Sequence, residues 1–245
     1  QVPSNPLKGI IMKFENAVVL VTGANRGLGQ EFARQALERG AKRVYAGARD
    51  ASSVKLAGVE PIQLDVTKRE DVLAAAGKIG DLTILINNAG IAQTGGFLPA
   101  NAQAQLQDHL NTNLFGVLNL SQAFAPILAK NGGGAIINML SLLSFVSTPV
   151  LGTYGVSKAA AWALTNGLRQ ELRQQGTQVV GVHAGFIDTD LTRGFDAPKV
   201  TPESVVRNTF DAVEAGALEA LADEPSHQIQ QALSSSVYLT DIHAG

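Results

Sequence analysis

Short apolar runs alternate with longer segments of helical periodicity along this chain, and that alternation restricts its fold more than any other feature. Six short, mostly apolar runs are typical of strands buried on both faces of a sheet: 17–23, 43–48, 59–66, 82–90, 135–140 and 178–183. Residues 217–222 are expected to supply a seventh. Strands that alternate with helices favour a parallel sheet. The sequence therefore predicts an α/β fold, a single-domain doubly wound parallel sheet of about seven strands with helices on both faces.

Helices are expected between these runs. The expected helical segments are 27–40, 68–79, 102–130, 154–175, 201–213 and 226–234, with an irregular stretch at 184–200. Thr67 is predicted to cap the second segment, and Thr201 the fifth, with Pro202 at its first helical position. The sequence NGGG after Lys130 is expected to end the long third segment.

The composition argues against several kinds of site and partner. The 245 residues are 45% hydrophobic and 16% charged, with a net charge of -2 and no run of like charges, so no nucleic-acid or anionic-membrane surface is expected. No apolar stretch is long enough for a membrane span. There is no cysteine, and the four histidines lack metal-ligand spacing, so we expect no disulfide, no metal site and a cytoplasmic protein.

Residues 1–11, QVPSNPLKGII, precede Met12 and lack the apolar core of a signal peptide. We interpret them as a vector-derived extension or disordered arm, the alternative being a short native arm on the surface. No linker, internal repeat or low-complexity tract divides residues 12–245, which are interpreted as one domain.

The first apolar run leads directly into the glycine-rich stretch TGANRGLG, residues 22–29, inside which a helix is expected to begin. Its glycines allow a tight turn and let the backbone approach a bound anion. The N-terminus of the helix offers unpaired N–H groups and a favourable dipole to that anion. Because this loop follows the first strand of a β–α–β unit, it favours a site for the pyrophosphate of a dinucleotide. A glycine-rich turn by itself can also bind nothing.

Two further stretches accompany this loop: NNAG at 87–90 ends the fourth apolar run, and YGVSK at 154–158 begins a helix. The glycine spacing is Gly-x-x-x-Gly-x-Gly, not the Gly-x-Gly-x-x-Gly of most dinucleotide enzymes. In this order, the three stretches resemble the short-chain dehydrogenase/reductase family, from about residue 14 onward. The resemblance implies a Rossmann-type oxidoreductase that uses a nicotinamide cofactor.

Position by position, the resemblance implies a set of cofactor-binding residues: Gly23, Asn25, Arg26, Gly27, Leu28, Gly29, Arg49, Asp65, Val66, Asn88, Ala89, Gly90, Tyr154, Lys158, Gly185, Ile187 and Thr189. Asp65 is expected to bind the adenine amino group, or else to form a turn at the end of its strand. Thr189 is expected to contact the carboxamide or the pyrophosphate. The chain departs from the family pattern at Ala184, where most members have proline before the glycine, and this affects little beyond the stiffness of the loop.

The end of the second apolar run bears on which nicotinamide cofactor is used. Family members that prefer NAD usually have an acid at the position of Ala48 to bind the ribose hydroxyls. Alanine does not repel a 2′-phosphate, and the next residue, Arg49, can offer that phosphate a planar fork of donors. Arg26 is a second cation of this kind. These residues predict NADP(H) in preference to NAD(H), unless Arg49 is a solvated charge paired with Asp50.

Tyr154 and Lys158 stand four residues apart at the start of an expected helix, which places both on one helical face. An unperturbed tyrosine has a pKa of about 10, so its anion is scarce at neutral pH. The ammonium group, like the positive ring of an oxidised nicotinamide, is predicted to lower the pKa of Tyr154 and make it a usable general acid/base. Lys158 is also expected to hydrogen-bond the nicotinamide ribose. Taken alone, the two residues could equally form a surface pair.

The resemblance supplies two catalytic partners for Tyr154. Ser141 precedes it by thirteen residues, the family spacing of the serine that hydrogen-bonds the substrate oxygen. Asn113 matches the asparagine of a long helix that holds a water on the path to the lysine. Neighbours of the same residue type are rivals: Ser144, Ser147 and Asn111.

Residues 142–146 and 186–198 are expected to face the substrate. They are mostly apolar, with one main cation: Leu142, Leu143, Phe145, Phe186, Leu191, Phe195 and Arg193. An apolar pocket favours a small hydrophobic ketone, aldehyde or secondary alcohol. The alternative is that these residues form core beneath a mobile lid.

Three functions compete for this sequence. The first is an NADPH-dependent carbonyl reductase, or the reverse alcohol dehydrogenase, and the second is an epimerase or dehydratase on the same fold. The third is a non-catalytic NADP-binding sensor or scaffold, a class that tends to lose the tyrosine or the lysine. The resemblance also implies a homodimer or homotetramer formed through the long helices, where the small residues of KAAAWAL at 158–164 allow close contact.

Overall fold

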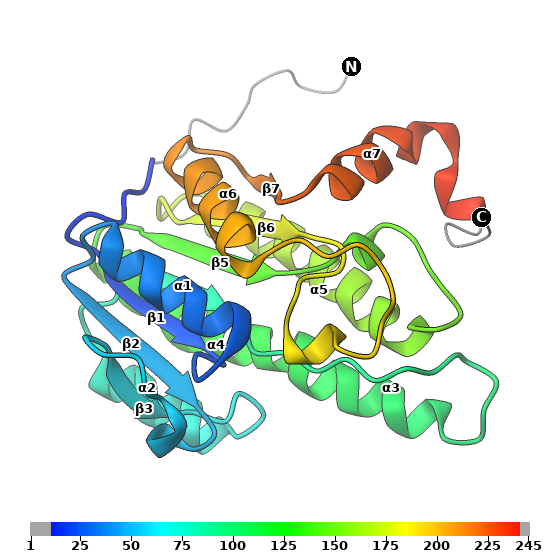
Figure 1. The fold of residues 1–245 in the computed structure, drawn as a ribbon. Helices are drawn as coiled ribbons and strands as arrows, with labels where there is room; N and C mark the ends of the chain where they lie inside the picture. Colours follow the sequence, from blue (N-terminus) through cyan, green and yellow to red (C-terminus); the bar gives the residue numbers. More distant parts are fainter. Residues whose placement is uncertain (1–10, 241–245) are drawn as a thin grey trace.

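The computed structural model describes residues 11–240, and within them the chain forms one seven-stranded parallel sheet with helices on both faces (Figure 1). The predicted fold class is confirmed. The strands lie in the order β3–β2–β1–β4–β5–β6–β7, and their bounds are β1 Val18–Thr22, β2 Arg43–Ala48, β3 Glu60–Gln63, β4 Ile84–Asn87, β5 Ala135–Met139, β6 Gln178–His183 and β7 Glu219–Leu221. Apart from Ile11, the predicted N-terminal extension lies outside the described residues.

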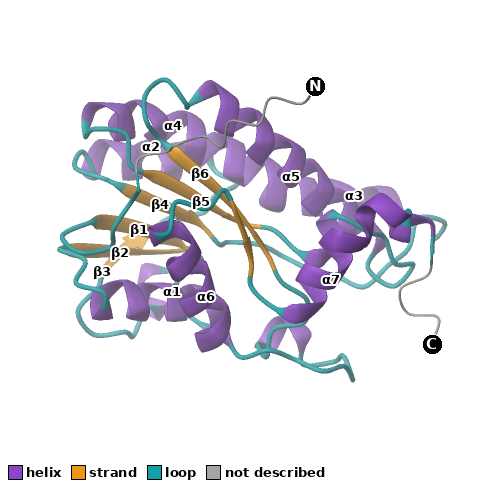
Figure 2. Cartoon of the chain, turned by 90° about the horizontal axis from the view of Figure 1, so that it is seen from above, coloured by secondary structure: helices purple, strands orange, loops and turns teal. Residues whose placement is uncertain are grey.

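The helices lie in two layers. Their bounds are α1 Gly27–Glu38, α2 Arg69–Lys78, α3 Ala102–Leu110, α4 Gly116–Lys130, α5 Gly152–Glu171, α6 Pro202–Glu214 and α7 Glu224–Ala232. Helices α1 and α6 cover one face of the sheet, and α2, α4 and α5 cover the other (Figure 2). Within residues 11–240, no helix combines the length and apolar character that a bilayer crossing requires.

Strand β1 shows why the predicted strands are apolar throughout. Val19 and Val21 pack into the core beneath α1 and α6, whereas Val18 and Leu20 pack into the core beneath α2, α4 and α5. Because side chains alternate between the two faces and both faces are covered, every position of the strand needs an apolar residue.

The sheet reverses its winding direction between β1 and β4. From β1 the chain proceeds outward to β2 and β3, and from β4 it proceeds the other way to β7. A crevice forms where two neighbouring strands send their connections in opposite directions, beyond the carboxyl ends of the strands. The glycine loop follows β1 and the NNAG stretch follows β4, so both lie at this point of reversal.

Several local predictions are confirmed and one is wrong. Thr201 caps α6 by accepting a hydrogen bond from the Ser204 amide at 3.2 Å, and β7 forms the seventh strand. Thr67 does not cap α2, which begins at Arg69. The Thr67 hydroxyl instead donates to Asp65 Oδ1 at 2.7 Å, because the carboxylate at the strand end competes for it.

Some helix boundaries also differ from the predictions. The segment predicted at 102–130 is interrupted at Asn111–Phe115 by a π-helical turn between α3 and α4. Helix α7 starts at Glu224, two residues before the predicted start, because Asp223 accepts a hydrogen bond from the Ser226 amide and caps it. Helix α5 ends at Glu171, short of the predicted Gln175.

Candidate active site

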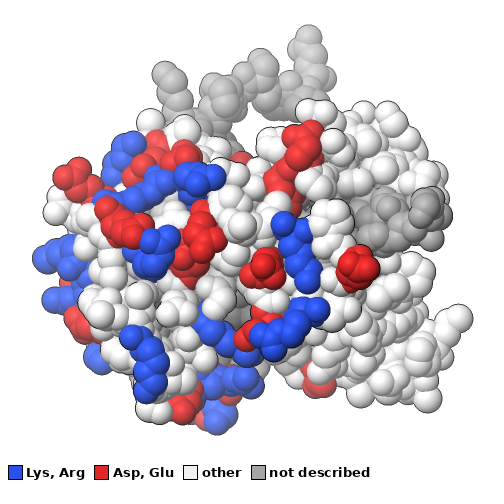
Figure 3. Space-filling view, viewed as in Figure 1, with Lys and Arg blue, Asp and Glu red and all other residues white. Residues whose placement is uncertain are grey.

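A cleft of about 850 Å³ opens at the carboxyl ends of the strands, at the point where the sheet reverses. Every predicted cofactor-binding residue lines it, from the glycine loop to Thr189. Ser141, Tyr154 and Lys158 also line it, whereas Asn113 does not. On the face drawn in Figure 3, acidic and basic side chains are interspersed, and no broad patch of a single sign is visible.

The glycine loop is shaped so that its backbone borders the cleft. Gly23 and Gly27 have φ angles of +64° and +52°, which residues with a side chain rarely adopt. A Cβ atom added at Gly29 would overlap the carbonyl group of Gly23 and lie 2.5 Å from Asn88 Nδ2. The start of α1 can therefore pack against the end of β1 only without side chains, and this leaves a bare helix N-terminus beside the cleft. The residues present fit a dinucleotide pyrophosphate.

Thr22 joins the glycine loop to the NNAG stretch. Its hydroxyl oxygen accepts hydrogen bonds from the amides of Asn88 at 3.1 Å and Ala89 at 3.0 Å. Asn88 Nδ2 returns a hydrogen bond to the Thr22 carbonyl at 3.0 Å. These contacts hold the two walls of the cleft in fixed register. Thr22 is absent from the predicted set, although it begins the TGANRGLG stretch.

Asp65, Arg49 and Arg26 also line the cleft. Asp65 accepts hydrogen bonds from Thr67, so the predicted alternative of a turn role is realised while Asp65 also borders the cleft. Burial raises the pKa of Asp65, but the Thr67 hydrogen bonds, together with the charges of Lys68 and Arg49, outweigh it and hold the pKa below its usual range. Asp50 does not pair with Arg49, because its carboxylate accepts from the amide and hydroxyl of Ser52.

Arg26 reaches across the mouth of the cleft. Its guanidinium forms an ion pair with Asp190 at 3.3 Å, and Asp190 also pairs with Arg193. The pair links the glycine loop to the irregular segment that follows β6. Arg193 was expected to be the main cation facing the substrate, but in the structure it is largely exposed and neutralised by this carboxylate.

Tyr154 and Lys158 lie on the first turns of α5 and point into the cleft. Lys158 Nζ lies 5.8 Å from the centre of the Tyr154 ring and donates to the carbonyl of Met139 at 2.7 Å. Burial raises the pKa of Tyr154 to about 12, and a hydrogen bond with the Ser141 side chain opposes that rise. Burial lowers the pKa of Lys158 to about 8.

The pKa of Tyr154 is therefore raised and not lowered, so the predicted net direction is wrong: burial decides it, and not the charge of Lys158. Lys158 is buried and Tyr154 is half-buried, and removal from water disfavours the charged form of each. The ammonium is also directed at a backbone carbonyl instead of the phenol. At neutral pH Tyr154 carries its proton, which is the state required of a proton donor.

Ser141 follows β5 and begins a short 3₁₀ turn, Leu142–Ser144. Its Oγ accepts from the Leu143 amide at 3.1 Å, and its own amide donates to Ser144 Oγ at 3.2 Å. Of the rival serines, Ser144 is thus occupied in this turn and Ser147 is exposed, and neither lines the cleft. Ser141 is the serine that the fold brings to Tyr154.

Asn113 is buried in the π-helical turn and does not line the cleft. Its Oδ1 accepts from the Ile91 amide at 2.9 Å, and its Nδ2 donates to the Ile91 carbonyl at 3.0 Å and to Ser157 Oγ at 2.9 Å. The rival Asn111 is exposed and accepts from Gln107. Asn113 therefore ties the loop after β4 to α5, the helix of Tyr154. Single π-helical turns of this kind are frequent at functional sites.

The stretch of chain that builds the cleft also matches a known family. Residues 17–199 match the family model described as short chain dehydrogenase. The chain belongs to the short-chain dehydrogenase/reductase family. The resemblance found in the three sequence stretches is thereby confirmed, and the protein is an oxidoreductase of this family.

Individual relatives agree with this assignment. A 3-oxoacyl-[acyl-carrier-protein] reductase of Staphylococcus epidermidis is 34% identical over 190 residues, which cover 72% of this chain and 78% of that protein. A short chain dehydrogenase from Burkholderia cenocepacia J2315, solved in complex with NADP, is 38% identical with a TM-score of 0.89, covering 94% of this chain and 100% of that one. Another family member, from Burkholderia phymatum in complex with NAD, shares the fold at 22% identity and a TM-score of 0.79, covering 96% of this chain and 98% of that one.

In this short-chain dehydrogenase, most apolar residues predicted to face the substrate are instead packed together. Of that set, only Leu191 lines the cleft. Leu142, Leu143 and Phe145 are buried in a cluster that contacts α5 and α7, and the rings of Phe186 and Phe195 lie 5.0 Å apart beside it. The alternative prediction, that these residues form core, holds for the 142–146 segment.

Other cleft residues were missed by sequence reasoning. They are mostly neighbours of predicted residues, brought to the cleft when the strand ends converge: Asp50, Ser53, Leu64, Thr67, Ile91, Thr112, Met139, Leu140, Asp190 and Thr192. Asp223 was also missed. Its carboxylate accepts from the Gly185 amide at 2.6 Å and so fixes the loop after β6, although no local pattern links two residues so far apart.

Proposed function

We propose that this short-chain dehydrogenase interconverts a ketone or aldehyde and its alcohol with NADP(H), and that Tyr154 is the general acid/base. One observation carries the proposal. Tyr154, Ser141 and Lys158 line the same cleft as the glycine loop at the start of α1. A cofactor lying along the cleft would thus have its pyrophosphate at a helix N-terminus and a proton donor near its reacting end.

Two side chains, Tyr154 and Ser141, act on the carbonyl oxygen during the reduction. When bound, the cofactor supplies a hydride for the carbonyl carbon. Tyr154 gives its phenolic proton to the carbonyl oxygen, and Ser141 offers that oxygen a second hydrogen bond. Because the oxygen becomes negative only as the reaction proceeds, both donors favour the transition state over the bound substrate.

Lys158 acts on the phenolate that remains after the proton has left. With a pKa lowered to about 8, it is still mainly an ammonium at pH 7. Its charge lies one helical turn from Tyr154 in an enclosed site, where screening by water is weak. Asn113 holds the Ile91 backbone and α5 in register so that these groups keep their spacing.

The preference for NADP(H) rests on Ala48, Arg49 and Arg26. Ala48 ends β2 without a carboxylate, and Arg49 follows it at the rim of the cleft. Arg26 would exchange part of its contact with Asp190 for the 2′-phosphate. The NADP-bound relative at 38% identity supports this preference.

A homodimer or homotetramer is proposed as well. Phe115 and Val156 leave 43% and 39% of their surfaces exposed, beside α4 and on α5. Large exposed apolar side chains on neighbouring long helices favour contact with a second copy. Light scattering on the purified protein measures the assembly state.

The test of the proposed function is cofactor oxidation against a panel of ketones and aldehydes, with NADPH and NADH compared at equal concentration. We expect turnover with NADPH and a lower kcat/KM with NADH. Equal or better use of NADH would contradict the cofactor assignment. Cofactor binding without turnover on any carbonyl would favour the sensor or scaffold alternative.

A further inference from the structure

His183 is a buried histidine at the end of β6, with no exposed surface. Its Nε2 lies 2.6 Å from Glu219 Oε2, and its Nδ1 lies 3.1 Å from the backbone carbonyl oxygen of Ser141. The ring stacks on Phe145, with ring centres 4.1 Å apart. His183 therefore bridges an acid on β7 and the main chain of the serine that faces the cleft.

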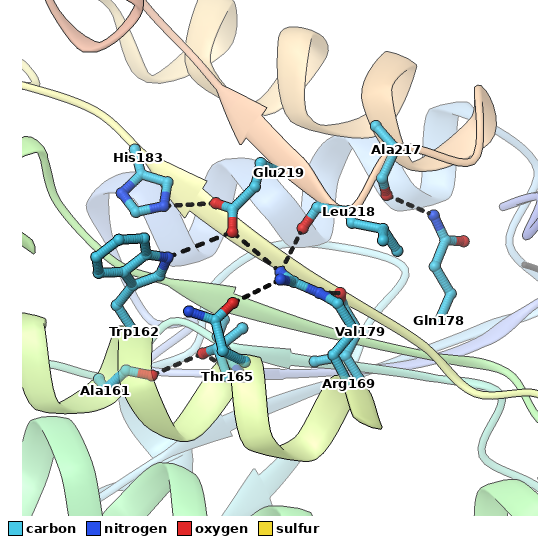
Figure 4. A network of polar contacts seen from close by, with 12 residues as sticks. Ala161, Trp162, Thr165, Arg169, Gln178, Val179, His183, Ala217, Leu218 and Glu219 are labelled. Carbon is cyan, nitrogen blue, oxygen red and sulfur yellow. Dashed lines mark hydrogen bonds and ion pairs between the residues drawn. The ribbon is translucent and has the colours of Figure 1, made fainter. Parts of the chain in front are cut away.

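Glu219 is anchored by side chains of α5 (Figure 4). Its Oε1 accepts from Arg169 at 3.1 Å and from Trp162 Nε1 at 3.3 Å. Arg169 is in turn held by the carbonyls of Val179 at 3.1 Å and Leu218 at 2.7 Å. Helix α5 also carries Tyr154, so this chain of contacts joins the helix of Tyr154 to the backbone of Ser141 by a second route.

The two partners of His183 decide whether its ring nitrogens donate or accept hydrogen bonds. A carbonyl and a carboxylate can only accept hydrogen bonds, so both contacts are made when each ring nitrogen carries a hydrogen. Burial raises the pKa of Glu219, but the hydrogen bond and charge of His183, together with Arg169, hold it below its usual range. Glu219 is thus a carboxylate, and it faces Nε2 of the His183 ring.

Ser141 depends on accurate placement. Its amide, Oγ and carbonyl all have partners within its own turn, and the carbonyl accepts from the Ser144 amide at 3.0 Å. His183 is the side chain that holds its carbonyl from outside that turn. A shift of about 1 Å in a group that orients the reacting atoms can cost about 100-fold in rate.

We propose that His183, oriented by Glu219, is a positioning residue that fixes Ser141 against Tyr154. This inference rests on the proposed function, in which Ser141 binds the substrate oxygen. His183 touches neither substrate nor cofactor, because it lies behind the strand ends and does not line the cleft.

Two substitutions separate the two contacts of the ring. In His183→Asn the amide nitrogen can occupy the place of Nδ1 and keep the hydrogen bond to Ser141. In His183→Gln the amide can occupy the place of Nε2 and keep the contact with Glu219, while the Ser141 carbonyl loses its side-chain donor and keeps only the Ser144 amide, at 3.0 Å. His227→Gln, at an exposed position of α7, is the matched control. Glu219→Gln provides a second route to the same question if either His183 variant fails to fold.

Two readouts are measured for each variant: kcat and KM with NADPH and a ketone, and amide hydrogen exchange of the peptide that contains residues 141–145. We expect His183→Gln to lower kcat about tenfold, to leave the KM for NADPH within about twofold, and to speed exchange in this peptide. We expect His183→Asn to stay within about threefold of the wild type in both readouts. We expect Glu219→Gln, which leaves His183 able to donate to Ser141 but removes the carboxylate that orients the ring, to fall between the two His183 variants, with kcat lowered about three- to tenfold and faster exchange in this peptide.

Three results would overturn the positioning role. The first is an unchanged kcat and unchanged exchange in His183→Gln. The second is a similar loss of kcat in both His183 variants that is proportional to their loss of thermal stability. The third is a larger loss of kcat in His183→Asn than in His183→Gln. Because hydrogen exchange does not depend on turnover, it tests the hold on Ser141 even if the wild type reduces no ketone, an outcome that would contradict the proposed function alone.

Discussion

The cofactor end and the reaction end of the cleft are formed by different kinds of chemical group. The cofactor end consists of backbone and glycine, from residues close together in sequence: Gly23, Gly27 and Gly29 after β1. The reaction end consists of polar side chains from segments far apart in sequence: Ser141 after β5, and Tyr154 and Lys158 on α5, with His183 of β6 and Glu219 of β7 behind them. The first end is therefore intolerant of added atoms, and the second is intolerant of a lost proton or hydrogen bond. The predictions below test this difference, starting with the largest expected effect.

Gly29→Ala tests the cofactor end most severely. The added Cβ would overlap the Gly23 carbonyl, so the start of α1 must move away from the glycine loop. We expect NADPH binding to be lost and the thermal midpoint to fall, as measured by cofactor fluorescence and calorimetry. Gly77→Ala in α2 is the matched control, since no atom lies within 4 Å of its added Cβ. It should stabilise the protein by up to about 1 kcal/mol. Normal NADPH affinity in Gly29→Ala would contradict the packing described for this loop.

Ser141→Ala tests the reaction end. Removing the hydroxyl takes away a donor for the substrate oxygen and the hydrogen bond that opposes the raised pKa of Tyr154. We expect kcat for ketone reduction to fall about 100-fold with little change in NADPH affinity. Ser147→Ala, at an exposed position of the same segment, should be neutral. A small effect of Ser141→Ala on kcat would mean that another group binds the oxygen.

The pH dependence reports on Lys158. Burial lowers its pKa to about 8, so its ammonium is present below pH 8 and is lost as the pH rises through that value. Tyr154, with a pKa of about 12, keeps its proton over the same range and adds no fall of its own. We expect kcat/KM for NADPH in ketone reduction to fall roughly tenfold between about pH 7 and about pH 9. A flat profile over this interval would show that the lysine charge is not needed.

Arg49→Ala is expected to have the smallest effect and tests cofactor choice. The side chain is at the rim of the cleft, where a charge-assisted hydrogen bond is partly screened by water. We expect kcat/KM with NADPH to fall about three- to tenfold and kcat/KM with NADH to stay unchanged. Arg173→Ala, exposed and remote from the cleft, is the control. An equal loss with both cofactors would place the role of Arg49 elsewhere than at the 2′-phosphate.

The same contrast between the two ends explains what the sequence could predict. The sheet, its helices and the glycine loop follow from patterns that act within one strand–turn–helix unit, and the residues predicted there all line the cleft. Competition between neighbouring side chains was harder to predict. Thr67, for example, does not cap α2, because its hydroxyl donates to the Asp65 carboxylate. The π-helical turn around Asn113 likewise has no periodic signature in the sequence.

Long-range contacts could not be predicted at the reaction end. The pattern of Tyr154 and Lys158 indicates two groups on one face of a helix, but it does not indicate that the ammonium binds the Met139 carbonyl. Nor does it show that both groups are enclosed, and enclosure decides the direction of their pKa shifts. The contacts of His183 with Ser141 and Glu219 join three strands and exist only once the sheet has formed.

The most direct test of the central claim is NADPH oxidation by Tyr154→Phe beside the wild type, with NADPH binding measured on the same samples. Phenylalanine keeps the ring and removes the proton that is to be given to the carbonyl oxygen. We expect kcat to fall about 1,000-fold or more while NADPH affinity stays within about twofold of the wild type. A variant that binds NADPH normally and retains more than about a tenth of the wild-type kcat would contradict the account, because the proton would then come from another group.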